Sequence, residues 1–187
     1  NGTAYTSTFQ SIPVKKDMRV FANVGCASMG YGLPAAIGAK LAAPDSEVIL
    51  ITGDGSIQMN IQELQTIINL KLPIKIFNSG VMVGADSSSG VILPSLEKIA
   101  AAYGFAFFRL SNNREAEEQI SRILAQPGPV IIEVMTDPME NLQPKAASKR
   151  LPDGSLYSAP LEDMAPFLDR EEFMQNMLIE PYDEVQQ

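Results

Sequence analysis

The segment VILITGDGSIQMN, residues 48–60, constrains the fold of this chain more than any other stretch. Its apolar and β-branched start is typical of a buried strand, the sequence Gly53-Asp54-Gly55-Ser56 interrupts that strand as a tight turn, and a helix is predicted from residue 60 onward. A strand, a turn and a helix in this order build open parallel sheets, whose ligands bind beyond the carboxyl ends of the strands.

Asp54 is a candidate ligand of a hard cation, and the N–H groups of Gly55 and Ser56 are placed to face phosphate oxygens. An Asp-Gly pair is also a common turn without any ligand. A turn needs only one glycine with a positive φ, whereas two glycines around an acid indicate that the backbone approaches a ligand closely. The segment therefore predicts a binding site at Asp54, at the carboxyl end of a central strand of the sheet.

Composition narrows the possible functions. A chain of 187 residues with 45% hydrophobic residues can form one domain with a sizeable core. The net charge of −8, without a dense Lys/Arg run, argues against nucleic-acid and membrane partners. The single Cys26 excludes an internal disulfide, and the absence of histidine excludes Cys/His zinc sites and Ser-His or Cys-His catalytic pairs. With no signal peptide or apolar span, we expect a cytoplasmic protein.

Strands and helices alternate along the first three quarters of the chain. Strands are predicted at residues 48–52, 74–77, 105–109 and 130–135, and helices at residues 29–42, 60–70, 94–103 and 114–125. Asn60 and Glu63 have the spacing of a helix cap. Continuous apolar strands suit burial on both faces, so we predict an α/β fold of three layers, a mostly parallel sheet with helices on both faces.

The residues after 137 differ in character. They are rich in Pro, Asp and Glu, with one short amphipathic stretch at residues 170–179. We predict two regions, a binding domain at 1–137 and an extended carboxyl-terminal segment at 138–187.

Two segments together resemble a known family. GCASMGYGLPAAIGAKLA at residues 25–42 and VILITGDGSIQMNIQELQTIINLKLPIKIF at residues 48–77 resemble the C-terminal diphosphate-binding domain of thiamine-diphosphate-dependent enzymes, in particular the acetolactate synthase-like group. The resemblance covers residues 1–137. It implies the thiamine-diphosphate-binding fold and an enzyme, a transferase or lyase, that decarboxylates a 2-oxo acid and joins the remaining carbons to an acceptor.

The resemblance also implies cofactors and partners. These are thiamine diphosphate, Mg²⁺, a 2-oxo acid substrate, a pyrimidine-binding N-terminal domain from the same or a neighbouring chain, and assembly into a homodimer or homotetramer. The carboxylate that activates the pyrimidine belongs to that other domain, so these 187 residues alone should be inactive. By the same resemblance, the segment after residue 137 packs on the domain or at the mouth of the active site. A surface tail against a neighbouring domain is an open alternative. Open alternatives are a thiamine-diphosphate decarboxylase of another 2-oxo acid, a carbon–carbon hydrolase, or a non-catalytic module that has lost its metal site.

The resemblance assigns roles to particular residues. It makes Asp54 the magnesium ligand, Met29 the apolar prop that bends the cofactor, and the Ala27 carbonyl the acceptor for the pyrimidine amino group. The diphosphate would be bound by the backbone of residues in the amino-terminal loop and around Asp54, namely Gly2, Thr3, Ala4, Gly53, Gly55 and Ser56. Without the neighbouring GYGLPAAIG, an ordinary core methionine is the better interpretation of Met29, and Cys26 is expected to be a small buried residue rather than a nucleophile.

One departure from the family pattern stands out. The family has an Asn-Asn pair about two dozen residues after its GDG sequence, but here Phe77 is followed by Asn78-Ser79-Gly80. We therefore expect a loop-length segment between Phe77 and Asn78 to be deleted or omitted, the junction to be mobile, and Asn78 to be a loop residue rather than a metal ligand. Neither Glu63, in the predicted cap, nor Asp86, in a Ser-rich loop, replaces the missing catalytic carboxylate.

Overall fold

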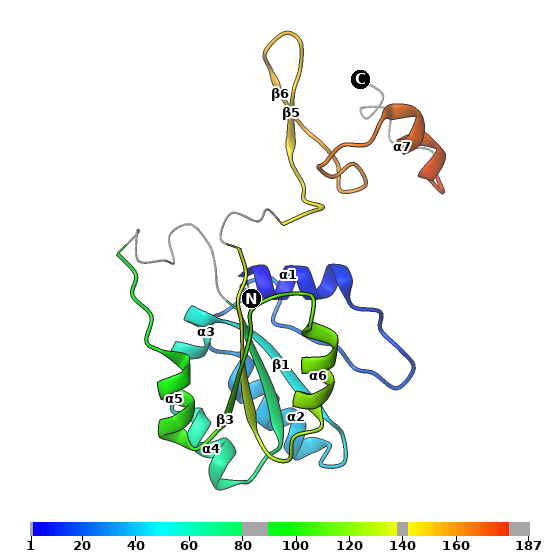
Figure 1. The fold of residues 1–187 in the computed structure, drawn as a ribbon. Coiled ribbons are helices and arrows are strands. Elements are labelled where there is room, and N and C mark those ends of the chain that lie inside the picture. The colour runs from blue at the N-terminus through cyan, green and yellow to red at the C-terminus, as the bar shows by residue number, and fades with distance from the viewer. Residues whose placement is uncertain (1, 80–89, 138–141, 180–187) are drawn as a thin grey trace. The chain divides into compact units, whose positions relative to one another are not determined.

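The computed structural model describes residues 2–79, 90–137 and 142–179. The chain divides into two compact units, Asn1–Glu140 and Asn141–Gln187, and each is described by itself (Figure 1). Asp86 lies outside the described residues. Within the described ranges, no helix combines the length and the apolar character that crossing a membrane requires.

The first unit is built on a four-stranded sheet in which every pair of neighbours is parallel. The strands are β1 (Val48–Gly53), β2 (Ile74–Ser79), β3 (Ala106–Leu110) and β4 (Val130–Val134), in the order β1-β2-β4-β3. Their apolar runs explain why these segments form strands, and the two central strands, β2 and β4, are the most buried. The predicted parallel α/β sheet is therefore confirmed.

Helices cover both faces of this sheet (Figure 1). One face packs against α2 (Gly32–Ala42), α4 (Glu63–Asn69) and α5 (Leu96–Tyr103), and the other against α6 (Ala116–Leu124). Two helices were not predicted, α1 (Gly2–Ser11) and the short α3 (Asp54–Gln58). The predicted three-layer arrangement is confirmed.

Alternation along each strand separates the two apolar layers. Leu50, Ile76 and Ile131 point toward α2, α4 and α5, and they belong to one core cluster. Ile132 belongs to a second cluster on the opposite face, with Ile123 of α6. Each fully buried isoleucine stabilises the fold by roughly 1.5–3 kcal/mol through removal of apolar surface from water. These two layers make the sheet a rigid base for the residues at its carboxyl end.

Strand β2 runs without interruption through Phe77 and Asn78. Phe77 is the register partner of Ile51 and Ile132, and Asn78 is the partner of Thr52 and Glu133. The two residues are therefore consecutive in one regular strand. The expected loop position of Asn78 is therefore wrong, because the residue is paired with both neighbouring strands. The deleted or omitted segment and the mobile junction stay predictions.

Strand β1 lies at an edge of the described sheet, although Asp54 had been expected to follow a central strand. The α6 face of this edge is uncovered, so Ile49 and Ile51 are 46% and 39% exposed. Asp54 still directly follows the carboxyl end of β1. The position of the predicted site relative to the strand direction is thus as expected, and only its position across the sheet differs.

The second unit is a hairpin followed by a helix, not an extended segment. The hairpin consists of β5 (Ser148–Arg150) and β6 (Leu156–Ser158), and the helix is α7 (Arg170–Asn176). Asp169 caps α7 by accepting a hydrogen bond from the Glu171 N–H. The expectation of an extended segment failed because its polar composition concealed contacts between residues distant in sequence.

A buried carboxylate connects the two parts of this unit. Asp163 has a side chain 1% exposed, and it forms ion pairs with Lys149 of the hairpin and with Arg170 of α7. Arg170 donates from both terminal nitrogens, at 2.9 and 2.8 Å. The hydrogen bonds from Arg170, and then those from Lys149, hold the pKa of the Asp163 carboxyl below its usual value although burial raises it.

We predict that Asp163→Asn destabilises the second unit by about 2 kcal/mol, because two cations lose their shared charged acceptor while they remain partly hydrated. Native-state hydrogen exchange of the α7 amides measures this loss. Glu162→Gln is the matched control, since Glu162 is exposed and carries the same charge.

The same two variants test how the stability of the second unit depends on pH. A lowered pKa means that Asp163 stabilises the folded unit above its unfolded pKa, about 3.9, and that this contribution is lost as the pH falls through the folded pKa. The stability of Asp163→Asn should therefore depend less on pH below about 4 than that of Glu162→Gln. Equal exchange rates in both variants would contradict the role of Asp163.

Candidate functional site

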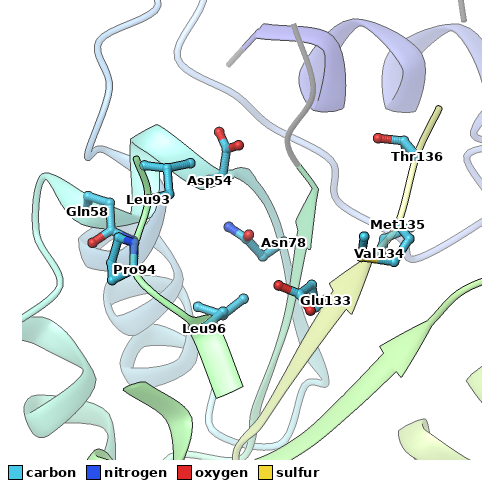
Figure 2. Close-up of a pocket in the computed structure, with 10 residues that line it drawn as sticks. All are labelled: Asp54, Gln58, Asn78, Leu93, Pro94, Leu96, Glu133, Val134, Met135 and Thr136. Carbon is cyan, nitrogen blue, oxygen red and sulfur yellow. The ribbon is translucent and has the colours of Figure 1, made fainter. Parts of the chain in front are cut away.

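A pocket of about 140 Å³ opens at the carboxyl end of the sheet. Figure 2 shows its lining side chains, which come from the ends of β2 and β4, from both ends of α3 and from the segment that leads into α5. The lining residues are Asp54, Gln58, Asn78, Leu93, Pro94, Leu96, Glu133, Val134, Met135 and Thr136. Parallel strands bring these residues together because their carboxyl ends lie at one edge.

Asp54 begins a helix rather than a tight turn. Gly53 is the extended residue before α3, with φ −85° and ψ 158°, and Asp54 is the first residue of the helix. The Asp54 Oδ1 atom accepts the Gly55 N–H at 2.6 Å. The sequence GDGS therefore forms a strand-to-helix junction, with the Asp54 carboxylate at the pocket and Ser56 buried beneath it.

Asn78 reaches the same pocket from the end of β2. Its side chain is 4% exposed, and its Nδ2 atom has no hydrogen-bond partner within the described residues. An unpaired buried amide donor costs roughly 1–3 kcal/mol. Figure 2 shows the Asn78 amide and the Asp54 carboxylate at the same end of the sheet. Asn78 is thus a residue of the site, contrary to its predicted place in a loop.

The residues just before α2 are fixed to the strand-to-helix junction through Gly30. The Gly30 N–H donates to Ser56 Oγ at 3.1 Å, and its carbonyl accepts from Asn60 Nδ2 at 2.9 Å. Gly30 has φ +88°, and a Cβ there would lie 2.8 Å from both Asn60 Nδ2 and Met59 Cβ. Only glycine fits this position. Asn60 therefore holds Gly30. The predicted cap formed by Asn60 and Glu63 is wrong, because Gln62 occupies the N-cap position of α4 and makes no side-chain cap hydrogen bond.

Met29 lies against Gly55. Its Cε is 3.0 Å from the point that a Cβ of residue 55 would occupy, so the absence of that side chain makes room for the methionine. Met29 is 50% exposed, which excludes the core-methionine alternative. Ala27, two residues earlier, has φ +46°, a strained value for a residue with a side chain. Cys26 is exposed, so its expected burial is wrong.

The remaining predicted residues lie in α1 or outside the pocket. Gly2, Thr3 and Ala4 form the start of α1 instead of a loop, and α1 contacts β1. Figure 1 shows this helix across the carboxyl end of the sheet. Glu63 begins α4 and accepts a hydrogen bond from Thr66 at 2.9 Å. The phosphate-binding role of the α1 residues stays a prediction.

Glu133 and its partner Arg109 were not among the predicted site residues. Arg109 Nε donates to Glu133 Oε2 at 2.6 Å, and Glu133 lines the pocket. Hydrogen bonding to Glu133 raises the already high pKa of Arg109, so the guanidinium remains charged. A charged residue near the end of the apolar strand VIIEV was the available indication, because such a charge is expensive to bury unless it is paired.

The donor set suits a magnesium ion bound together with phosphate. Within the described ranges, no three His, Cys, Asp or Glu side chains cluster closely enough to form a metal site. Asp54 supplies one carboxylate, and the unpaired amide of Asn78 supplies a second polar group. Mg²⁺ commonly takes one or two carboxylates and completes its octahedron with phosphate and water oxygens. The residues present therefore fit the group.

The fold and the pocket define a class, an α/β domain that can bind a cation and phosphate at the carboxyl end of a parallel sheet. Residues 1–134 match the family described as thiamine pyrophosphate enzyme, C-terminal TPP binding domain. The chain belongs to this family and is an acetolactate synthase-like domain for thiamine diphosphate.

Its relatives include acetolactate synthases. Identity is 38% to the acetolactate synthase large subunit of Cyanidium caldarium, over 66% of this chain and 24% of that protein. Identity is 36% to the acetolactate synthase isozyme 3 large subunit of Escherichia coli (strain K12), over 71% of this chain and 26% of that protein. It is 32% to acetolactate synthase 3, chloroplastic, of Brassica napus, over 72% of this chain and 24% of that protein. The chain thus spans about a quarter of the length of these relatives.

We predict that Gly30→Ala destabilises the first unit by about 2–4 kcal/mol, because it combines a disfavoured φ with overlap against Asn60 and Met59. Chemical denaturation measures the free energy of unfolding of Gly30→Ala and of a control variant, Gly38→Ala. Gly38 lies in α2 with nothing within 4 Å of its missing Cβ, so that control should be stabilising by up to about 1 kcal/mol. Equal stability of the two variants would show that Gly30 is not needed at the junction.

Proposed function

We propose that this chain binds thiamine diphosphate through a Mg²⁺ ion held by Asp54, as part of an enzyme that decarboxylates a 2-oxo acid and joins the product to an acceptor. One observation carries the proposal: a carboxylate and a buried, unpartnered amide, from the ends of adjacent parallel strands, lie at one pocket. The buried Asn78 donor is unfavourable until its nitrogen faces an acceptor, and the amide oxygen is then free to bind a cation beside Asp54.

The strand-to-helix junction would bind the diphosphate and its metal. Asp54 is the charged metal ligand, and Asn78 supplies an amide oxygen to the same ion. Backbone N–H groups then approach the phosphate oxygens, from residues near Asp54 and from the start of α1: Gly53, Gly55, Ser56, Gly2, Thr3 and Ala4. The missing side chain of Gly55 allows this close approach.

The residues before α2 would bind the organic part of the cofactor. Thiamine diphosphate, when bound, supplies a nucleophilic carbon and an electron sink. Met29 would prop the bent cofactor from its place against Gly55, and the Ala27 carbonyl would accept the pyrimidine amino group. The hydrogen bonds of Gly30 to Ser56 and Asn60 keep these residues in register with the metal site.

Other partners are proposed from the same reasoning. The pyrimidine-activating carboxylate would come from an N-terminal domain of the same or a neighbouring chain in a homodimer or homotetramer, so the 187 residues alone would be inactive. The length of the acetolactate synthase relatives supports this. The carboxyl-terminal unit would pack on the domain or at the mouth of the active site. Cytoplasmic location without nucleic-acid or membrane partners agrees with the net charge of −8.

A second candidate is a module that binds the cofactor without catalysis. The direct continuation of β2 from Phe77 into Asn78 favours it, because the family pattern places a longer segment with an Asn-Asn pair there. Measurements of cofactor affinity and of turnover on the intact protein distinguish the two candidates. Binding with turnover of a 2-oxo acid supports the enzyme, and binding without turnover supports the module.

Asp54→Asn should weaken Mg²⁺-dependent binding of thiamine diphosphate by at least about 100-fold, because the metal loses its charged protein ligand. Isothermal titration calorimetry of the intact protein, with and without Mg²⁺, measures the change. Asp45→Asn is the control, since Asp45 is an exposed aspartate in the turn before β1. Unchanged affinity in Asp54→Asn would refute the metal assignment.

Met29→Ala should lower turnover by about tenfold or more while Mg²⁺ affinity changes little, because a displaced cofactor reacts poorly although its diphosphate remains bound. Met29→Leu should retain most of the activity, since leucine is also bulky and apolar. Met18→Ala is the control, as Met18 is another exposed methionine. A loss of activity in Met18→Ala equal to that in Met29→Ala would remove the case for a prop.

A further inference from the structure

We propose that Glu133, held by Arg109, is a positioning residue that orients the Asn78 amide so that its oxygen faces the cation beside Asp54. The inference rests on the proposed function, because it concerns the metal that Asp54 would bind. It assigns a role to an ion pair that the cofactor itself need not touch.

The register of the sheet places four polar residues in one row. Thr52 of β1 pairs with Asn78 of β2, Asn78 pairs with Glu133 of β4, and Glu133 pairs with Arg109 of β3. Register partners in a parallel sheet project to the same face, about 4.8 Å apart from strand to strand. Glu133 and Asn78 are therefore side-chain neighbours, and Figure 2 shows both at the floor of the pocket.

The row two residues earlier, which projects to the same face of the sheet, is entirely apolar. It consists of Leu50, Ile76, Ile131 and Phe107, which belong to or pack against one core cluster. The change from an apolar row to a polar row takes place within two residues on all four strands. A carboxylate this close to a core is costly unless it has charged and hydrogen-bonding partners.

Asn78 requires an acceptor for its nitrogen, and of its two register partners only Glu133 is an acceptor alone. The buried Nδ2 of Asn78 has no partner among the described residues. A half-turn of the amide about its Cβ–Cγ bond exchanges Nδ2 and Oδ1. An ionised carboxylate only accepts hydrogen bonds, whereas the hydroxyl of Thr52 can donate or accept. Glu133 therefore selects the orientation in which nitrogen faces it and oxygen faces the metal.

Arg109 keeps the carboxylate in place for this task. It donates to Glu133 Oε2 from Nε at 2.6 Å, and its Nη2 lies 3.5 Å from Glu97 Oε2 of α5. Its guanidinium also lies over the Phe107 ring, 5.4 Å from the centroid. In the described part of the chain, these contacts occupy only one oxygen of Glu133, so Oε1 remains available to Asn78.

The test is the affinity of the intact protein for Mn²⁺ in the presence of thiamine diphosphate. Electron paramagnetic resonance measures it. Glu133→Met keeps the length of the side chain and removes the acceptor, and it should weaken Mn²⁺ binding by about 10- to 100-fold, as the loss of groups that orient a ligand does elsewhere. Glu97→Met is the matched control. It removes the second carboxylate that pairs with Arg109, and Glu97 does not belong to the polar row. Its Mn²⁺ affinity should stay within about twofold of wild type.

A second substitution separates orientation from structural support. Asn78→Asp replaces the amide with a carboxylate whose two oxygens are equivalent, so it needs no orienting neighbour. In the Glu133→Met background it should restore Mn²⁺ affinity to the wild-type level or above. In the wild-type background, Glu133 repels the new carboxylate, and the gain should be absent.

The outcomes distinguish this inference from the proposed function. If wild type binds no Mn²⁺ with thiamine diphosphate, the proposed function fails. If wild type binds and Glu133→Met binds equally well, or if Asn78→Asp gives the same change in both backgrounds, the positioning role is overturned. Thermal unfolding checks that each variant folds. Should Glu133→Met not fold, Arg109→Gln serves instead, and unchanged affinity in that variant would also overturn the role.

Discussion

The parallel register of four short strands is the constraint on which the site depends. All four strands run in one direction with matched ends, so residues at the same register position form a row across the sheet. One such position is the level at which the rows change from apolar to polar. Below that level the side chains are apolar and fix the strands between two helical layers. At that level the row is polar, and the residue after β1 is an acid. The pocket therefore needs no dedicated loop to bring its carboxylates and amide together.

A second set of interactions couples this edge to the residues before α2. Gly30 lies so close to Asn60 and Met59 that no side chain fits, and its two backbone groups are both hydrogen bonded across the junction. The hydrogen bonds of Gly30 also fix the neighbouring Met29, which lies against Gly55. Two glycines, one on each side of the contact, thus set the distance between the segment proposed to bind the thiamine rings and the segment proposed to bind its diphosphate.

Much of the first unit was predictable from local patterns. The four strands follow from apolar runs, and α2, α4, α5 and α6 follow from helical spacing, with ends displaced by a few residues. Helix α1 was missed because its Gly, Thr and Ser residues carry no apolar periodicity. Asp54 could be identified because two glycines flank it. Asn78 was misplaced because comparison with a family pattern favoured a missing segment, whereas strand length and register decide its position. The partners of Glu133 and Asp163 depend on strand pairing and long-range ion pairs, which no local pattern encodes.

The two units are stabilised by different forces. The first rests on buried isoleucine and leucine side chains, while the second gathers around the Asp163 carboxylate, two cations and the rings of Phe167 and Phe173. Ionic strength should therefore act on them in opposite ways. A salt such as sulfate strengthens apolar burial in the first unit and screens the partly exposed cations of the second. The first unit would then tolerate salt, whereas the second would be sensitive to it. The ionic strength would decide how much of the second unit is ordered while the first remains folded.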